Sequence, residues 1–95
     1  MAPPIEHEEH DHRGAFFVAQ DGKRIATMTY SRANASLVII DHTEVDGDLK
    51  GQGMGRKLLD AAVLWARETG TKLMATCPFA KAQFDKEPSL RDVLL

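Results

Sequence analysis

The sequence has little of what secreted, membrane-spanning or nucleic-acid-binding proteins need. A single cysteine, Cys77, cannot form an internal disulfide. No basic and then apolar leader opens the chain, and apolar runs such as residues 37–40 are far too short to cross a bilayer. The formal net charge of −2 leaves no surplus of Lys and Arg to neutralise a phosphate backbone. We therefore expect a soluble, cytoplasmic protein, a monomer or a weak homodimer, without nucleic-acid or membrane partners.

Length and composition predict one ordered domain. The 95 residues are 43% hydrophobic and 27% charged, which is ordinary for a globular protein, and we expect the domain to span residues 13–95. Residues 1–12 have little to bury, so we expect a flexible lead-in to the first strand. Its histidines, His7, His10 and His12, are interpreted as solvated side chains, because a flexible segment lacks the fixed geometry of a metal site. No metal is expected.

The first half of the chain shows the patterns of β-strands. Two apolar stretches, residues 15–19 and 25–30, flank an Asp-Gly pair, which is a strong hairpin signal. Residues 36–45 are rich in β-branched side chains and predict a central strand. Strict alternation in its second half puts His42 and Glu44 on one face and Asp41 and Thr43 on the other.

The second half of the chain changes to a helical period. A glycine-rich loop ends at Gly55, and apolar residues then recur at helical spacing from Met54 to Thr69. Gly70 suits a left-handed cap, and residues 72–76 predict a short strand parallel to residues 36–45. Pro78 can open a second helix that runs through Lys86. This order of elements predicts an α/β fold.

The glycine loop combines the features of an anion site. A strand, a glycine turn and a helix start direct unpaired main-chain N–H groups outward. Arg56 and Lys57 lie in the first helical turn, where cations oppose the helix dipole unless an anion is bound. Glycines alone indicate only a flexible loop beside solvated charges, but the flanking elements and cations favour phosphate binding. The spacing matches neither the mononucleotide loop nor the dinucleotide-binding fingerprint.

Residues 50–55 (KGQGMG) resemble the pyrophosphate loop of the GCN5-related N-acetyltransferase superfamily, which reads Gln/Arg-x-x-Gly-x-Gly/Ala. Lys50 keeps the charge of the first position but loses the fork geometry of arginine. Together with residues 41–45 (DHTEV) and 77–80 (CPFA), the loop is similar to the short, single-domain branch described as YjdJ-like or NATD1-like. The resemblance covers residues 15–95.

The resemblance implies acetyl-CoA or coenzyme A as the cofactor. It implies a compact fold in which two parallel strands splay apart, with the pyrophosphate on main-chain amides of the loop and the pantetheine between the strands. The early helix pair and last strands, which commonly help to form the acceptor site, are missing from the chain. The cofactor-binding residues implied are Val45, Lys50, Gly51, Gln52, Gly53, Met54, Gly55, Arg56, Lys57, Cys77 and Phe79.

Three residues are candidates for the chemistry of acetyl transfer. His42 and Glu44 would lie near the thioester and could accept the proton of an amine, or they could be ordinary polar residues at a strand end. The family's tyrosine donor aligns with Phe84, which has no proton to give. Cys77 begins a helix, where the dipole lowers the pKa of a thiol, so it could be an acid, an acyl acceptor or a buried hydrophobe.

We therefore expect an acetyl-CoA-binding N-acetyltransferase-like protein, which transfers acetyl from acetyl-CoA to an unidentified amine. The missing tyrosine and the short acceptor half keep a second hypothesis open, a non-catalytic acyl-CoA-binding or regulatory module. A third hypothesis, a structural interaction domain without a cofactor, would make the glycine loop coincidental.

Overall fold

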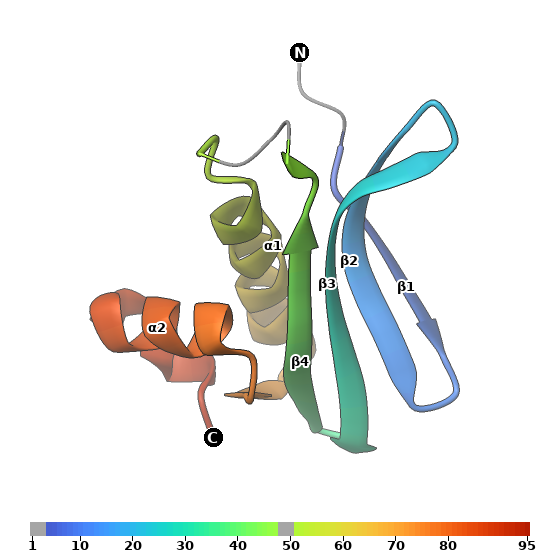
Figure 1. The fold of residues 1–95 in the computed structure, drawn as a ribbon. Coiled ribbons are helices and arrows are strands. Elements are labelled where there is room, and N and C mark those ends of the chain that lie inside the picture. The colour runs from blue at the N-terminus through green and yellow to red at the C-terminus, as the bar shows by residue number, and fades with distance from the viewer. Residues whose placement is uncertain (1–3, 48–50) are drawn as a thin grey trace.

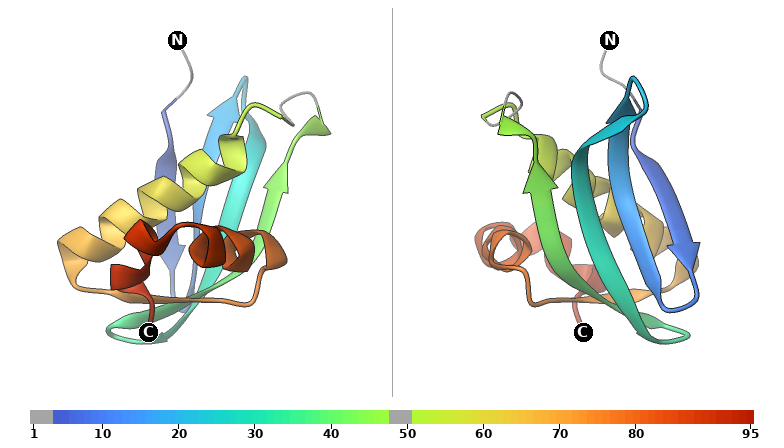
Figure 2. Two further views of the ribbon diagram at one scale, coloured as in Figure 1. Left: turned by 90° about the vertical axis from the view of Figure 1, so that its left-hand side faces the viewer. Right: turned by 45° about the vertical axis from the view of Figure 1, so that its right-hand side comes forward.

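A five-stranded mixed sheet with two helices on one face makes up the structure, a computed structural model that describes residues 4–47 and 51–95. The strands lie in the order β1-β2-β3-β4-β5, antiparallel except for the parallel pair β4 and β5. The helices share one face of the sheet (Figures 1 and 2). The predicted α/β class, antiparallel N-terminal strands and parallel pair are confirmed. The elements are β1 (Glu6–His10), β2 (Arg13–Gln20), β3 (Lys23–Asn34), β4 (Leu37–Val45), α1 (Met54–Thr69), β5 (Lys72–Ala75), α2 (Pro78–Lys86) and the 3-10 helix η2 (Pro88–Val93).

The turn between β2 and β3 has the residues that a tight hairpin requires. Asp21 and Gly22 have φ values of 54° and 78°. Positive φ at both central residues is the mark of a type I′ turn, whose twist matches that of the strands it joins. The predicted hairpin is therefore confirmed, with the ladder closing at Gln20 and Lys23.

Strand β1 lies in the segment that the sequence analysis placed outside the sheet, and residues 6–10 correct that expectation. His7 joins β1 to its neighbours: its ring stacks on Phe16 with the centroids 4.1 Å apart, and its Nε2 lies 2.7 Å from the hydroxyl oxygen of Tyr30. Glu9 forms an ion pair with Arg32 of β3. The polar residues of this segment predicted a lead-in. They form a strand nevertheless, because their side chains stack on, or form hydrogen bonds and ion pairs with, residues of β2 and β3.

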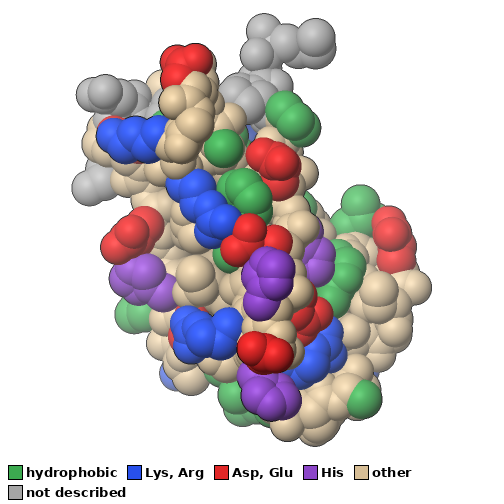
Figure 3. Space-filling view, turned by 90° about the vertical axis from the view of Figure 1, so that its right-hand side faces the viewer, with side chains coloured by type: hydrophobic (Ala, Val, Ile, Leu, Met, Phe, Trp, Pro, Cys, Tyr) green, Lys and Arg blue, Asp and Glu red, His purple; other side chains and the backbone are tan. Residues whose placement is uncertain are grey.

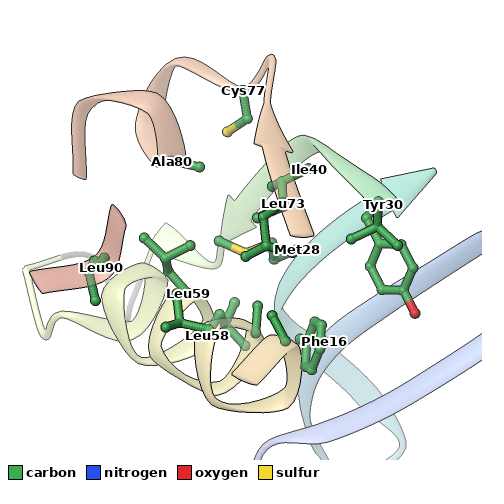
Figure 4. Packing of buried hydrophobic residues seen from close by; sticks show 14 of the residues in the cluster. Phe16, Met28, Tyr30, Ile40, Leu58, Leu59, Leu73, Cys77, Ala80 and Leu90 are labelled. Carbon is green, nitrogen blue, oxygen red and sulfur yellow. The ribbon is translucent and has the colours of Figure 1, made fainter. Parts of the chain in front are cut away.

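The core lies between the sheet and the helices, with α1, α2 and η2 all contributing buried residues (Figure 4). Helix α1 has the predicted bounds, and Gly70 ends it in the left-handed conformation with φ of 72°. Helix α2 also has its predicted bounds. In the part of the chain that the structure describes, no helix has the length and apolarity to span a bilayer. The buried residues of α1 are Met54, Gly55, Leu58, Leu59, Ala62, Val63 and Ala66.

The parallel strands β4 and β5 diverge after a short ladder. Their last register pair is Ile40 with Ala75. The carbonyl oxygen of Ile40 then accepts hydrogen bonds from the amides of both Thr76 and Cys77, at 2.9 and 3.2 Å, and the chain turns away into α2. Beyond Ile40, β4 continues to Val45 with β3 as its only strand partner among the described residues.

A β-bulge interrupts β4 where β5 leaves it. The β3 ladder pairs Tyr30 with Ile40 but Thr29 with His42, so Asp41 is an extra residue. Asp41 points to the same face as Thr29, whose hydroxyl donates a hydrogen bond of 2.5 Å to its Oδ1. Directly paired residues share a face, so His42 also lies on that face. It is the open face of the sheet, the one away from the helices.

The bulge reverses the alternation of side chains in the rest of β4. Glu44 follows His42 onto the open face, and Thr43 and Val45 turn to the helix side, where Val45 packs against the core. The sequence analysis correctly placed His42 and Glu44 together. It was wrong to place Asp41 with Thr43, because strict alternation assumes an uninterrupted ladder.

Candidate cofactor and active site

The start of α1 is built to leave main-chain N–H groups available. Gly51 and Gly53 have φ values of 87° and 70°, a region that favours glycine. Gly53 immediately precedes the helix, and neither a capping side chain nor an acidic residue serves its first turn. The first N–H groups of a helix lack intrahelical acceptors and carry the positive end of the dipole. The site therefore presents hydrogen-bond donors and partial positive charge to an anion.

A cavity of about 420 Å³ adjoins this helix start. It is bounded by the end of β4, by the glycine loop with the first turn of α1, and by one face of α2. A volume of this order is typical of a small-molecule site. The lining residues are Thr43, Val45, Gly51, Gly53, Met54, Gly55, Arg56, Phe79 and Gln83.

The third glycine of the loop has a packing role. A Cβ atom on Gly55 would lie 2.9 Å from the ring of Phe79, closer than van der Waals contact allows. The absence of a side chain at this position lets α2 approach α1 and brings the aromatic ring into the cavity wall. Close approach of phosphate to the main chain, the reason expected from the sequence, is thus not the only need for glycine here.

The cations of the predicted phosphate site lie in different settings. The guanidinium of Arg56 bridges the helices: its Nε is 2.8 Å from Asp60 in α1, and its Nη1 is 3.2 Å from Gln83 in α2 and 3.4 Å from Glu87 after it. Lys57 is exposed on α1 outside the cavity lining. Gln52 is exposed and also outside the lining, and Lys50 lies outside the described residues.

Cys77 is buried next to the cavity. Its side chain is 4% exposed, and its Sγ lies 3.3 Å from the Oγ1 of Thr43, which lines the cavity. Cys77 is the N-cap residue of α2, as predicted. The thiol itself is not among the lining groups. Phe84, which the sequence analysis aligned with the family's tyrosine donor, is 2% exposed and belongs to the core.

His42 and Glu44 form a pair on the open face of the sheet, which Figure 3 shows with its His, acidic and basic side chains. The Nε2 of His42 is 2.9 Å from the Oε1 of Glu44, and both side chains are largely exposed. A second cavity, of about 430 Å³ and lined by residues 24–27 and 43–46, adjoins Glu44. Thr43 and Val45 line both cavities, so the end of β4 forms a wall of each.

The structure thus brings together most of the predicted cofactor residues but separates the catalytic candidates. Seven predicted residues line one cavity, whereas Cys77 lies behind its wall and the His42–Glu44 pair lies on the other face. Sequence reasoning missed two lining residues. Gln83 follows Phe79 by one helical turn, a spacing that could have revealed it. No local signal revealed Thr43, because the bulge decides its direction. The seven are Val45, Gly51, Gly53, Met54, Gly55, Arg56 and Phe79.

A sequence model of one family matches most of the chain. It is described as GCN5-related N-acetyl-transferase, and it aligns with residues 15–93. The chain belongs to this family. The resemblance seen in the glycine loop is confirmed at this level, whereas membership in the short branch stays a prediction. The comparison with curated proteins gives no match.

Solved structures of the family share the fold. A GCN5-like candidate N-acetyltransferase from Staphylococcus aureus, determined by NMR, is 38% identical with a TM-score of 0.73, over 95% of this chain and 87% of that chain. The ribosomal-protein-S18-alanine N-acetyltransferase of Escherichia coli is 22% identical with a TM-score of 0.66, over 82% of this chain and 53% of that one. Tetrahymena GCN5 is 14% identical with a TM-score of 0.65, over 81% and 51%. The chain spans about half the length of these last two proteins.

Proposed function

We propose that the protein binds acetyl-CoA in the cavity at the start of α1 and transfers the acetyl group to an amine. The observation that carries this proposal is the junction of two features in one cavity: the donor-rich start of α1, and the edge of β4 that β5 leaves open beyond Ile40. Family membership makes an acyl-CoA the expected ligand.

The residues present fit such a ligand. The main-chain amides from Gly53 to Arg56 would hold the pyrophosphate, since they are donors at the positive end of a helix. The edge of β4 from His42 to Val45 offers main-chain groups to the amides of a pantetheine arm, and Phe79 supplies an apolar wall. When bound, acetyl-CoA supplies an activated acetyl thioester.

We propose that the His42–Glu44 pair accepts the proton that the amine releases. Acylation of an amine releases a proton from its nitrogen, and a carboxylate or imidazole at the acceptor side can take it. Glu44 borders the second cavity, which shares the lining residues Thr43 and Val45 with the cofactor cavity. In this arrangement the amine approaches from the open face of the sheet and acetyl-CoA from the helix side. Cys77 is the remaining candidate for an acid or an acyl acceptor, and its thiol lies 3.3 Å from the hydroxyl of Thr43 in the cavity wall.

Calorimetric titration with acetyl-CoA and with CoA, followed by assay of free-thiol release on a panel of amines, tests this function. We expect both ligands to bind and at least one amine to be acetylated. Glu44→Gln should keep acetyl-CoA affinity and lower turnover about 10²–10⁴-fold, the usual contribution of a general base. Failure of acetyl-CoA to bind the parent protein would refute the proposal.

The second candidate function is a non-catalytic acyl-CoA-binding module. It is favoured by Phe84, a buried core residue that the sequence resemblance aligns with the family's tyrosine donor. Tight binding of acetyl-CoA without turnover on any amine would support this function. Mass spectrometry after incubation separates a third outcome, in which Cys77 carries the acetyl group: an adduct labile to hydroxylamine that Cys77→Ala removes.

A further inference from the structure

The bulge in β4 coincides with the start of the proposed site. The ladder to β5 ends at Ile40, and the extra residue Asp41 follows at once. A shift of one residue in a strand exchanges its two faces. The bulge therefore decides that Thr43 and Val45 line the cofactor cavity while His42 and its hydrogen-bond partner face the other way.

Three side chains from β2 and β3 bind the carboxylate of Asp41 and form a clasp around it. Its Oδ1 accepts from the hydroxyl of Thr29 at 2.5 Å, and its Oδ2 accepts from Ser31 at 3.1 Å and from the guanidinium of Arg13 at 3.3 Å. Arg13 also donates to the hydroxyl of Ser31, at 3.2 Å. Partial burial of Asp41 acts to raise its pKa, but the two hydroxyl hydrogen bonds and the charge of Arg13 outweigh it and lower the pKa. The clasp thus favours the carboxylate form.

The clasp spans the interruption in the ladder. Thr29 pairs with His42 on one side of the bulge, and Ser31 pairs with Ile39 on the other. One carboxylate therefore connects the two registers of β3 and β4 across the residue that has no partner of its own. A bulge leaves its extra residue outside the ladder, and here the side chain provides the missing cross-strand connection.

We propose that Asp41, held by Arg13, Thr29 and Ser31, is the positioning residue that fixes the bulge and thereby directs Thr43 and Val45 into the cofactor cavity. Its effect on acetyl-CoA binding rests on the proposed function. Its effect on the direction of residues 43–45 does not. A surface ion pair with no such role would contribute to stability alone.

The test uses Asp41→Ala and a matched control on the same sheet face. Glu8→Ala removes the ion pair of Glu8 with Arg24, whose atoms are 2.6 Å apart, and neither residue lies on β4 or lines the cofactor cavity. Three quantities are measured for each full-length variant: the thermal midpoint, the affinity for acetyl-CoA by calorimetry, and the backbone NMR shifts and cross-strand NOEs of residues 42–45. The NMR data report the register without any ligand.

We expect Asp41→Ala to weaken acetyl-CoA binding about tenfold, equivalent to about 1.4 kcal/mol, and to change the NOEs between residues 42–45 and β3. Glu8→Ala should leave both unchanged. Two milder variants provide the test if Asp41→Ala fails to fold. Thr29→Val should show part of the change in affinity and NOEs, and Thr29→Ser, which keeps the hydroxyl, should retain the parental values.

Two outcomes would overturn the inference. Unchanged NOEs and affinity in Asp41→Ala, with only a lower thermal midpoint, would make the clasp an ordinary ion pair. Equal effects of Thr29→Val and Thr29→Ser would show that the hydroxyl has no part in it. If the parent protein binds no acetyl-CoA, the proposed function fails, and the NOE comparison still decides whether Asp41 fixes the bulge.

Discussion

A single charge placed at Gly53 should change stability and cofactor affinity in opposite directions. Gly53 has φ of 70° and ψ of 21° directly before α1, and a Cβ atom there would meet nothing within 4 Å. Asn and Asp are the non-glycine residues that best tolerate this left-handed region. Gly53→Asn and Gly53→Asp therefore introduce side chains of nearly equal shape, at a similar backbone cost of about 1 kcal/mol, and differ in one negative charge.

The charge should help the free protein and oppose the ligand. The first turn of α1 has no acidic residue. A carboxylate at the start of the helix interacts favourably with the helix dipole and stabilises the folded protein by about 0.3–1 kcal/mol. A pyrophosphate on the same amides would lie about 6 Å from that carboxylate, where two unit charges repel by about 2.8 kcal/mol at an effective dielectric constant of 20 and about half of that at 40. Gly53→Asp should therefore bind acetyl-CoA about 10–100-fold more weakly than Gly53→Asn.

Calorimetry and urea unfolding of the two variants measure these effects. Gly53→Asp should be the more stable variant without ligand and the weaker binder, and the difference in affinity should shrink at high salt. Pantetheine, which lacks the pyrophosphate, provides the control and should bind both variants equally. Equal affinities of the two variants for acetyl-CoA would place the pyrophosphate away from the start of α1 and refute the reasoning.

Three further predictions follow from contacts in other parts of the molecule. Glu87 competes for the guanidinium of Arg56, so Glu87→Gln should tighten acetyl-CoA binding a few-fold at low salt; calorimetry measures this, and no change would show that the phosphates do not use this cation. Gly14→Ala should lower the free energy of unfolding by about 1–3 kcal/mol, because its Cβ would overlap the ring of buried Tyr30, whereas Gly47→Ala meets nothing within 4 Å and should unfold in urea like the parent chain. Partial burial outweighs the nearby charge of Glu9 and, with a smaller contribution from Arg32, lowers the pKa of His7 below 6.5, so the unfolded chain takes up this proton first and stability should decline as the pH falls below 6.5. His7→Phe keeps a stacked ring and should weaken the decline of the thermal midpoint between about pH 7.5 and 5.5; an identical decline in the variant would assign it to other groups.

Local signals in the sequence predicted the elements well. The bounds of α1 and α2 follow from helical periodicity, Gly70 and Pro78, and the first hairpin follows from Asp21 and Gly22. Each of these signals acts over a few residues, and contacts with the rest of the chain do not change the elements that it predicts. The glycine loop also indicated a ligand site, since its chemistry belongs to the loop and the helix start.

Features that depend on distant partners could not be predicted in this way. His7 enters the sheet through Phe16 and Tyr30, which come from two other strands. The bulge in β4 depends on contacts of Asp41 with residues 10 to 28 positions away. Alternation along a single strand carries no information about such contacts, so Asp41 was wrongly placed on the same face as Thr43.

The coincidence of the bulge with the departure of β5 explains how so small a sheet can serve two cavities. The pairing of β4 with β5 ends at Ile40, which opens one edge of β4 to a ligand on the helix side. At Asp41 the alternation is reversed, which turns His42 and Glu44 to the open face. Neither change alone would suffice: without the splay the helix side would have no free strand edge, and without the bulge the polar pair would point into the cofactor cavity. The few residues after Ile40 therefore separate a proposed donor side from a proposed acceptor side by the thickness of one strand.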